Sequence, residues 1–141
     1  MTPTPTPTLT PLPQVVINEV MVDPLVDYDG NGVVDDGDKY IAIYSSTNVN
    51  VYLWSIQVGT ERYRFPFLNV PAGTEIVIYN SAMSLADLLT ERTIVLYTVA
   101  SEQRDAIQVA AVGYGKAYGR CPSASTNWAE IEPSPGSDNC P

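Results

Sequence analysis

The chain has 141 residues, of which 45% are hydrophobic and 16% are charged, enough for one domain with a packed core. Its 16 acidic and 7 basic residues give a net charge of -9. This balance argues against nucleic acids and anionic membranes as partners, because both bind clustered Lys and Arg. The sequence contains no histidine, which excludes Ser-His-Asp catalysis and His-ligated zinc. No apolar run approaches the roughly 20 residues that cross a bilayer, so no membrane insertion is expected.

The first segment, residues 1–13, alternates threonine and proline from Thr2 onwards. Proline fixes φ and lacks an N–H donor, so this segment is predicted to be an extended polyproline II spacer. We expect a linker that tethers residues 14–141 to other domains of a longer chain. The alternative is a tail without a role.

From Gln14 onwards, short β-type runs alternate with turn residues. About eight strands are expected, chiefly over residues 15–22, 39–45, 49–58, 61–65, 74–79, 93–99 and 105–114. In the second run, alternation places Ile41 and Ile43 on one face and Tyr40 on the other. One helix is expected, over residues 81–92 with Ser84 as its N-cap. The pattern predicts an all-β fold, an antiparallel β-sandwich, with a barrel as the alternative.

The last segment, residues 119–141, lacks periodicity and contains both cysteines, Cys121 and Cys140. A disulfide between them would close the tail into a loop and contribute about 3 kcal/mol in the chain-entropy account. Together with the tether and the acidity, it predicts an exported protein that is extracellular or at the cell surface. Two free thiols in a cytosolic protein are the alternative. Since Arg120 is the only base beside either cysteine, catalytic thiol chemistry is not expected.

The sharpest motif is the acidic segment over residues 27–38, Asp-Tyr-Asp-Gly-Asn-Gly-Val-Val-Asp-Asp-Gly-Asp. Counted from its first residue, oxygen-bearing side chains occupy positions 1, 3, 5, 9 and 12, and glycine occupies position 6. This is the EF-hand spacing, with Asp in place of the final Glu. It predicts a Ca²⁺ site whose ligands are Asp27, Asp29, Asn31, the carbonyl of Val33, Asp35 and Asp38.

Calcium needs six to eight oxygens at about 2.3–2.6 Å, which short side chains on a tight loop supply. Gly32 is expected at the chain reversal, and Val34 is expected to turn inward and anchor the loop. Asp36 falls outside the pattern and is expected to be solvated. An acidic turn without metal is the alternative, and magnesium fits less well because it prefers octahedral geometry. Pro24 argues against a preceding helix, so the loop is expected to join two strands as a structural staple.

Two resemblances follow from these residues. The acidic loop is similar to the calcium loop of dockerin repeats, but it occurs once and without paired helices, so a dockerin domain is not implied. From about Val15 to Asn139, the chain resembles the lamin-tail domain. The segments that carry this resemblance are Val16–Met21, Val49–Ile56, Phe65–Pro66, Val70–Gly73 with Glu75–Ile78, Gly119–Arg120, Trp128 and Pro133–Asn139.

The resemblance implies an immunoglobulin-like β-sandwich that serves as an extracellular accessory or interaction module and has no catalytic residues of its own. The calcium loop is then an insertion between the first two strands. Lamin-tail domains usually carry Gly before the Trp, where this chain has Leu53. They also usually carry acids on either side of the strand after the first loop, where this chain has Lys39 and Ala42.

Three functions are compatible with these patterns. The first is a non-catalytic, calcium-stabilised module for adhesion, display or interaction with a protein or glycan at the cell surface. The second is a carbohydrate-binding or substrate-targeting accessory module of an exported hydrolase, with Tyr63, Tyr114, Tyr118 and Trp128 as candidate stacking residues. Core packing is the alternative for Trp128, as it is for Trp54. The third is an enzyme that uses Glu19 and Asp23. It is disfavoured because no nucleophile or base is evident, and Glu19 is expected to be a surface or ladder residue of the first strand.

Overall fold

A computed structural model describes residues 15–140, so the predicted Thr-Pro linker over residues 1–13 lies outside the described residues. This part of the chain holds eleven strands: β1 (Val15–Met21), β2 (Tyr40–Ser45), β3 (Val49–Asn50), β4 (Ser55–Val58), β5 (Glu61–Arg64), β6 (Asn69–Val70), β7 (Thr74–Tyr79), β8 (Thr93–Tyr97), β9 (Gln103–Gln108), β10 (Ala117–Arg120) and β11 (Trp128–Ile131). A 3-10 helix, η1 (Asp36–Asp38), precedes β2, and a short α-helix, α1 (Asn80–Met83), follows β7.

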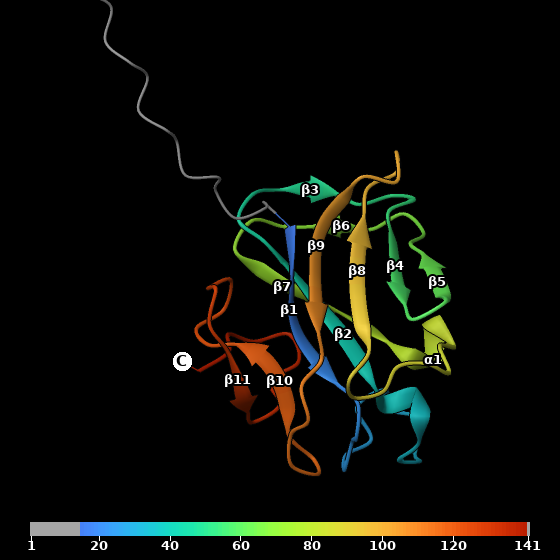
Figure 1. Cartoon of the computed structure of the whole chain (residues 1–141), viewed down its shortest axis with the longest axis vertical. Coiled ribbons are helices and arrows are strands. Elements are labelled where there is room, and N and C mark those ends of the chain that lie inside the picture. The colour runs from blue at the N-terminus through green and yellow to red at the C-terminus, as the bar shows by residue number, and fades with distance from the viewer. Residues whose placement is uncertain (1–14, 141) are drawn as a thin grey trace, which may run out of the picture.

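The strands form two main antiparallel sheets and a short ribbon (Figure 1). One sheet has five strands in the order β11-β10-β1-β2-β7, and the other has four in the order β5-β4-β8-β9. The ribbon pairs β3 with β6 at one end of the molecule (Figure 1). The predicted all-β antiparallel sandwich is therefore confirmed.

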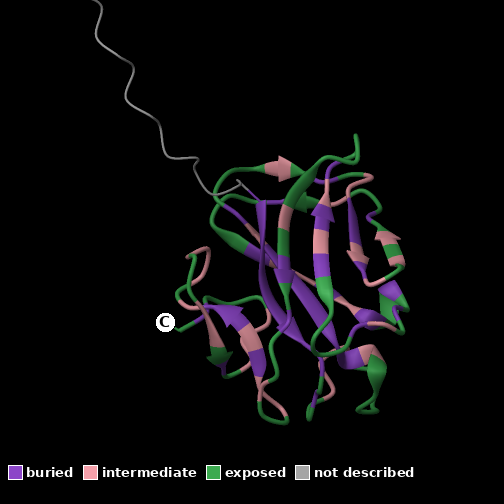
Figure 2. Cartoon of the chain, in the orientation of Figure 1, coloured by how far each residue is buried: buried purple, intermediate pink, exposed green. Residues whose placement is uncertain are grey.

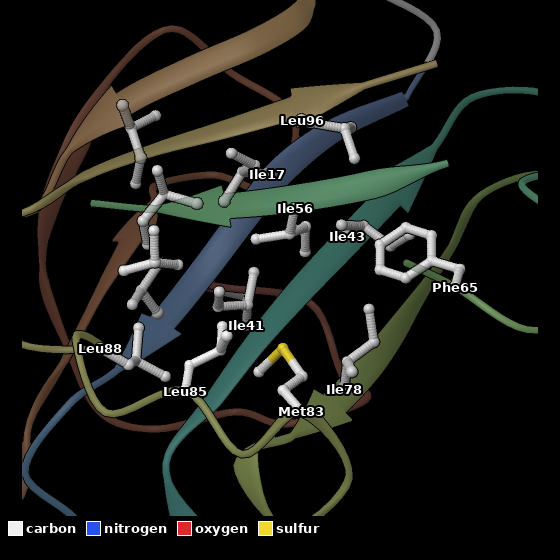
Figure 3. Packing of buried hydrophobic residues seen from close by; sticks show 14 of the residues in the cluster. Ile17, Ile41, Ile43, Ile56, Phe65, Ile78, Met83, Leu85, Leu88 and Leu96 are labelled. Atoms are coloured by element: carbon white, nitrogen blue, oxygen red, sulfur yellow. The ribbon is translucent and has the colours of Figure 1, made fainter. Parts of the chain in front are cut away.

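The hydrophobic core lies between the two main sheets, where alternate residues of each strand meet (Figure 3). Ile41 and Ile43 of β2 face Ile56 of β4 and Leu96 of β8 across this layer, and all four are fully buried. Tyr40 lies on the opposite face of β2, as the alternation predicts. The burial of these branched side chains is the main stabilising term of the sandwich.

The outer face of the five-stranded sheet is also covered, so polar residues on this face are buried. Strand β1 is buried along its whole length (Figure 2). A second cluster on this face joins Met21 and Tyr40 to Ile131. Residues 132–140, which we call the C-terminal strap, cross the same face. Ser134 of the strap donates hydrogen bonds to the Glu19 carboxylate from its N–H and its hydroxyl. Glu19 lies in the strand ladder, opposite Gly119 of β10 and Ala42 of β2, as one of its two expected placements has it. The other, a place at the surface, is wrong, because the strap buries its side chain completely.

The predicted helix over residues 81–92 is also wrong. The helix is only α1, and Ser84 ends it in a left-handed conformation with φ of 55° instead of starting it. The Asn80 carboxamide accepts from the N–H of Leu85 at 2.8 Å and donates to its carbonyl at 3.1 Å. These bonds take the backbone groups that a continuing helix would use.

Three other boundaries differ from the prediction. The run over residues 49–58 is interrupted where Trp54 N donates to Val51 O at 3.0 Å, which closes a turn between β3 and β4. Strand β9 ends at Gln108, well before residue 114. The tail over residues 119–141, expected to lack periodic structure, contains β11 and the end of β10.

Candidate metal centre

The acidic loop lies between β1 and β2 and is attached to the outer face of the five-stranded sheet. The ring of Tyr28 packs edge-on against that of Tyr40, with centroids 5.5 Å apart, and Tyr40 packs in the same way against Tyr79 at 6.0 Å. Tyr28 therefore anchors the loop. The prediction that Val34 turns inward is wrong, because this side chain is 48% exposed.

Three carboxylates of the loop converge. One oxygen from each of Asp27, Asp29 and Asp38 lies within 4.8 Å of the other two. Two oxygens bound to the same calcium ion, each at about 2.3–2.6 Å, are at most about 5 Å apart. The spacing of these oxygens therefore fits a single ion. Asp38 is fully buried, whereas the other two are half-buried.

Backbone N–H groups hold these carboxylates in place. Asp27 accepts from the N–H groups of Gly30, Asn31 and Gly32 at 2.7–3.1 Å. Asp38 accepts from Asp29 N at 3.0 Å and from Asp35 N at 2.8 Å, which ties the two ends of the loop together. Gly32 has φ of 90°, so the chain reverses there in a conformation that glycine favours, as the sequence predicts.

The pKa shifts of Asp38 and Asp29 have opposite directions. Burial raises the pKa of Asp38, but the N–H groups of Asp29, Asp35 and Tyr28 outweigh it and leave that pKa below its ordinary value. The pKa of Asp29 is raised, first by burial and then by the adjacent Asp27 and Asp38 carboxylates. None of the ion pairs between residues 15 and 140 includes Asp27, Asp29 or Asp38. No basic side chain of the described chain therefore relieves the crowding of these acids.

The other predicted ligands lie beside this cluster. Asn31 Oδ1 accepts from Val33 N at 2.9 Å, and Asp35 Oδ1 accepts from Gly37 N at 2.9 Å, where Asp35 is the N-cap of η1. The three converging carboxylates and these neighbours form the predicted ligand set, and metal binding by all six residues stays a prediction. The side chain of Asp36 is 87% exposed, as expected, although it also pairs with Lys39 at 3.4 Å.

The disulfide between Cys121 and Cys140 is confirmed, and it closes the strap onto the sheet. Beneath the strap lies a polar cluster that the sequence patterns did not reveal. Glu19 accepts from the Tyr40 hydroxyl and from the Ser134 hydroxyl. Glu75 accepts from Asn18 Nδ2 at 2.5 Å, and Asn139 Nδ2 donates to Asn18 O at 2.9 Å. The residues in these contacts are 21 to 121 positions apart, so no local signal could have indicated their contact.

Most of the predicted stacking aromatics are engaged in packing. Trp128 stacks on Tyr118 with ring centroids 4.9 Å apart, and the Arg120 guanidinium lies 4.8 Å from the Trp128 ring. Tyr63 packs against Phe65 with ring centroids 5.8 Å apart. Tyr114 is the exception, with 64% of its surface exposed. Trp54 packs against the core.

No known protein family matches this chain, and no curated protein matches it either. Within residues 15–140, none of the helices is long and apolar enough to cross a membrane.

Proposed function

We propose that this chain is a non-catalytic, calcium-stapled β-sandwich module that works outside the cell in adhesion, display or interaction with a protein or glycan. The observation that carries the proposal is the convergence of the Asp27, Asp29 and Asp38 carboxylates without a basic partner. A divalent cation would neutralise their repulsion, and carboxylate oxygens are the ligands that calcium prefers.

The staple would act on the connection between β1 and β2, which form the first hairpin of the five-stranded sheet. Asp27 and Asp29 lie at the start of the loop, and Asp38 lies directly before β2. An ion held by all three would fix the path of the chain from β1 to β2. A ligand that binds only the folded state, at a hundred times its Kd, adds about 2.7 kcal/mol to the free energy of unfolding.

Two observations support an extracellular lamin-tail-type module. The disulfide between Cys121 and Cys140 is a bond that persists in oxidising compartments. Leu53, which stands where lamin-tail domains usually carry glycine, has φ of 60°, a conformation that glycine adopts without strain. The proposal includes the immunoglobulin-like form of the sandwich.

The surroundings of Glu19 support a non-catalytic role. The carboxylate of this residue is fully buried and accepts from Tyr40 and Ser134. Asp23, its suggested partner in acid–base chemistry, is exposed. A substrate could not reach both groups while the strap is closed, which disfavours an enzyme that relies on this pair.

Thermal unfolding in calcium, in magnesium and in excess EDTA tests the proposal. We expect calcium to raise the Tm by about 5–10 °C relative to EDTA, and magnesium to raise it less. Asp29→Ala removes one converging carboxylate from a half-buried position and should abolish most of the calcium-dependent rise. Isothermal titration of the wild-type protein should give one site per chain.

Asp36→Ala is the matched control, because it removes the same charge from the same loop outside the carboxylate cluster. It should keep the calcium-dependent rise in Tm, whatever it does to the Tm in EDTA. Equal midpoints for the wild-type protein in all three buffers would show that the acidic loop is a turn without a metal, and the staple would be abandoned.

A further inference from the structure

The β3–β6 ribbon presents a polar and aromatic face to solvent that the calcium proposal does not use. The two strands pair antiparallel, with Val49 opposite Val70 and Asn50 opposite Asn69. Val51 N donates to Leu68 O at 2.9 Å, which extends the pairing by one position. Successive residues of paired strands point to opposite faces. The ribbon therefore has an inner face toward the core and an outer face toward solvent.

Burial agrees with this alternation. Val51 and Val70 are fully buried, and Leu68 packs against the core from the same side. On the outer face, Asn50 and Asn69 are both exposed. One step further along the ribbon, Tyr52 is 51% exposed and Phe67 is 70% exposed.

The aromatic pair forms a ledge at the end of this outer face. The rings of Tyr52 and Phe67 are in contact, with centroids 6.4 Å apart and planes inclined by 47°. Contiguous exposed apolar surface on a folded protein marks a candidate interaction site. Since the planes are inclined, the two rings offer separate faces to a ligand that crosses them.

Carboxamides line the adjoining surface. An open pocket of about 260 Å³ lies between Asn48, Asn50 and Asn69, with Val49, Val70 and Pro71 as its apolar part. The Oδ1 atoms of Asn48 and Asn50 accept from Ala72 N at 2.7 Å and from Tyr52 N at 2.9 Å. These bonds orient both carboxamides, and their Nδ2 groups make no hydrogen bond within the described part of the chain. They remain available as donors.

We propose that the outer face of the β3–β6 ribbon binds a neutral oligosaccharide of hexopyranose units. The apolar C–H face of a pyranose ring can pack on Tyr52 and Phe67, while its hydroxyl groups accept from the Asn Nδ2 donors. The pocket lining contains no charged residue, although the chain carries a net charge of -9. This local neutrality favours a sugar over a basic peptide, which the acidic loop would attract instead.

The size of the pocket indicates how the ligand would lie. Pockets that enclose drug-sized ligands have about 300–1,000 Å³. The smaller volume here fits one sugar unit, with neighbouring units lying over the aromatic ledge. This inference rests on the proposed role in glycan interaction but not on calcium, because the ribbon and the acidic loop lie at opposite ends of the sandwich (Figure 1).

The test is an NMR titration of the ¹⁵N-labelled protein with cellohexaose, chitohexaose and maltohexaose, each to about 10 mM, a concentration that detects millimolar affinity. At least one of them should shift the backbone and side-chain amide signals of Asn48, Asn50 and Asn69. Tyr52→Ala and Phe67→Ala should each weaken that binding by about three- to tenfold, the range expected for loss of one aromatic contact. Both residues are exposed, so the variants should keep the wild-type Tm.

Tyr114→Ala is the matched control, because it removes an exposed tyrosine from the β9–β10 connection at the other end of the molecule. It should leave the binding unchanged. No shifts with any of the three sugars, or shifts that Tyr52→Ala and Phe67→Ala do not weaken, would overturn the proposal. So would sedimentation showing that these two variants turn a dimer into a monomer, because the ledge would then be a contact between copies of this chain.

Discussion

Ser84 is one of six described residues other than glycine that have a positive φ. It is exposed and lies at the C-cap of α1, where glycine is preferred because it has no Cβ to clash with the backbone. We predict that Ser84→Gly raises the free energy of unfolding by about 0.5–1 kcal/mol, measured by urea denaturation. Ser81→Gly, inside the same helix, should lower it by up to about 1 kcal/mol. Equal effects of the two substitutions would contradict this explanation.

Glu75 combines burial with a neighbouring acid. Burial raises its pKa from 4.5 to about 7, with a contribution from Glu19, although hydrogen bonds from Asn18 and Gly136 oppose the rise. Between pH 4.5 and about 7, the folded state therefore binds more protons at this site than the unfolded state does. The free energy of unfolding should fall as the pH rises through this window, by at most about 3 kcal/mol.

Glu75→Gln removes the titrating group and keeps a side chain of the same shape. We predict that it flattens the fall in the free energy of unfolding between pH 5 and pH 7.5, measured by urea denaturation at intermediate values. Glu102→Gln, at an exposed position, should keep the wild-type slope. A Glu75→Gln variant with the wild-type slope would assign the titration to another group.

At the scale of the elements, a buried ion pair joins the two sheets. Arg120 of β10 pairs with Asp105 of β9 at 2.9 Å, and both side chains are almost fully buried. Arg120 Nε also donates to Ile17 O at 2.7 Å, while Ile17 N donates to the same Asp105 carboxylate at 2.8 Å. Since β9 belongs to the four-stranded sheet, this cluster fixes the sheets relative to each other.

Removing one partner of a buried ion pair leaves the other charge without compensation, at a cost of about 3–5 kcal/mol. We predict that Asp105→Asn lowers the free energy of unfolding by an amount of this order, measured by urea denaturation at pH 7. Asp23→Asn, the same change at an exposed position, should alter it by less than about 0.5 kcal/mol. A much smaller decrease in the free energy of unfolding for Asp105→Asn would show that the Arg120 guanidinium is stabilised in another way, by water or by the Ser125 carbonyl that accepts from it at 2.6 Å.

The strap depends on its disulfide, which closes a segment with a sequence separation of 19. A loop of this length accounts for about 3 kcal/mol of stabilisation. We predict that replacing Cys121 and Cys140 together with serine lowers the free energy of unfolding by about this amount. Hydrogen exchange should then increase first at Gly136 and Asn139, while the amides of β8 stay protected. Uniform loss of protection would mean that the strap and the sandwich unfold as one unit.

For the whole molecule, the sequence predicts best where the signal is the alternation or the spacing of residues within one segment. Strand β7 has its predicted bounds, and the acidic cluster forms because its spacing is local. Strand β10 was missed because its buried Arg120 is stabilised by a partner in another sheet, which no alternation reveals. The exposure of Tyr52 beside Phe67 depends on the pairing of β3 with β6, and this register is not encoded in either segment alone.

The position of β1 in its sheet has a consequence for the synthesis of the chain. This strand is made first among those described, and it pairs with β2 on one side and with β10, about a hundred residues later, on the other. Until residues 117–120 have left the ribosome, one edge of β1 has no backbone partner, and a strand with an open apolar edge is prone to aggregation. Folding that waits for such distant contacts is slow. A nascent chain of this protein therefore has to be kept from self-association until its last strands and its strap have been made.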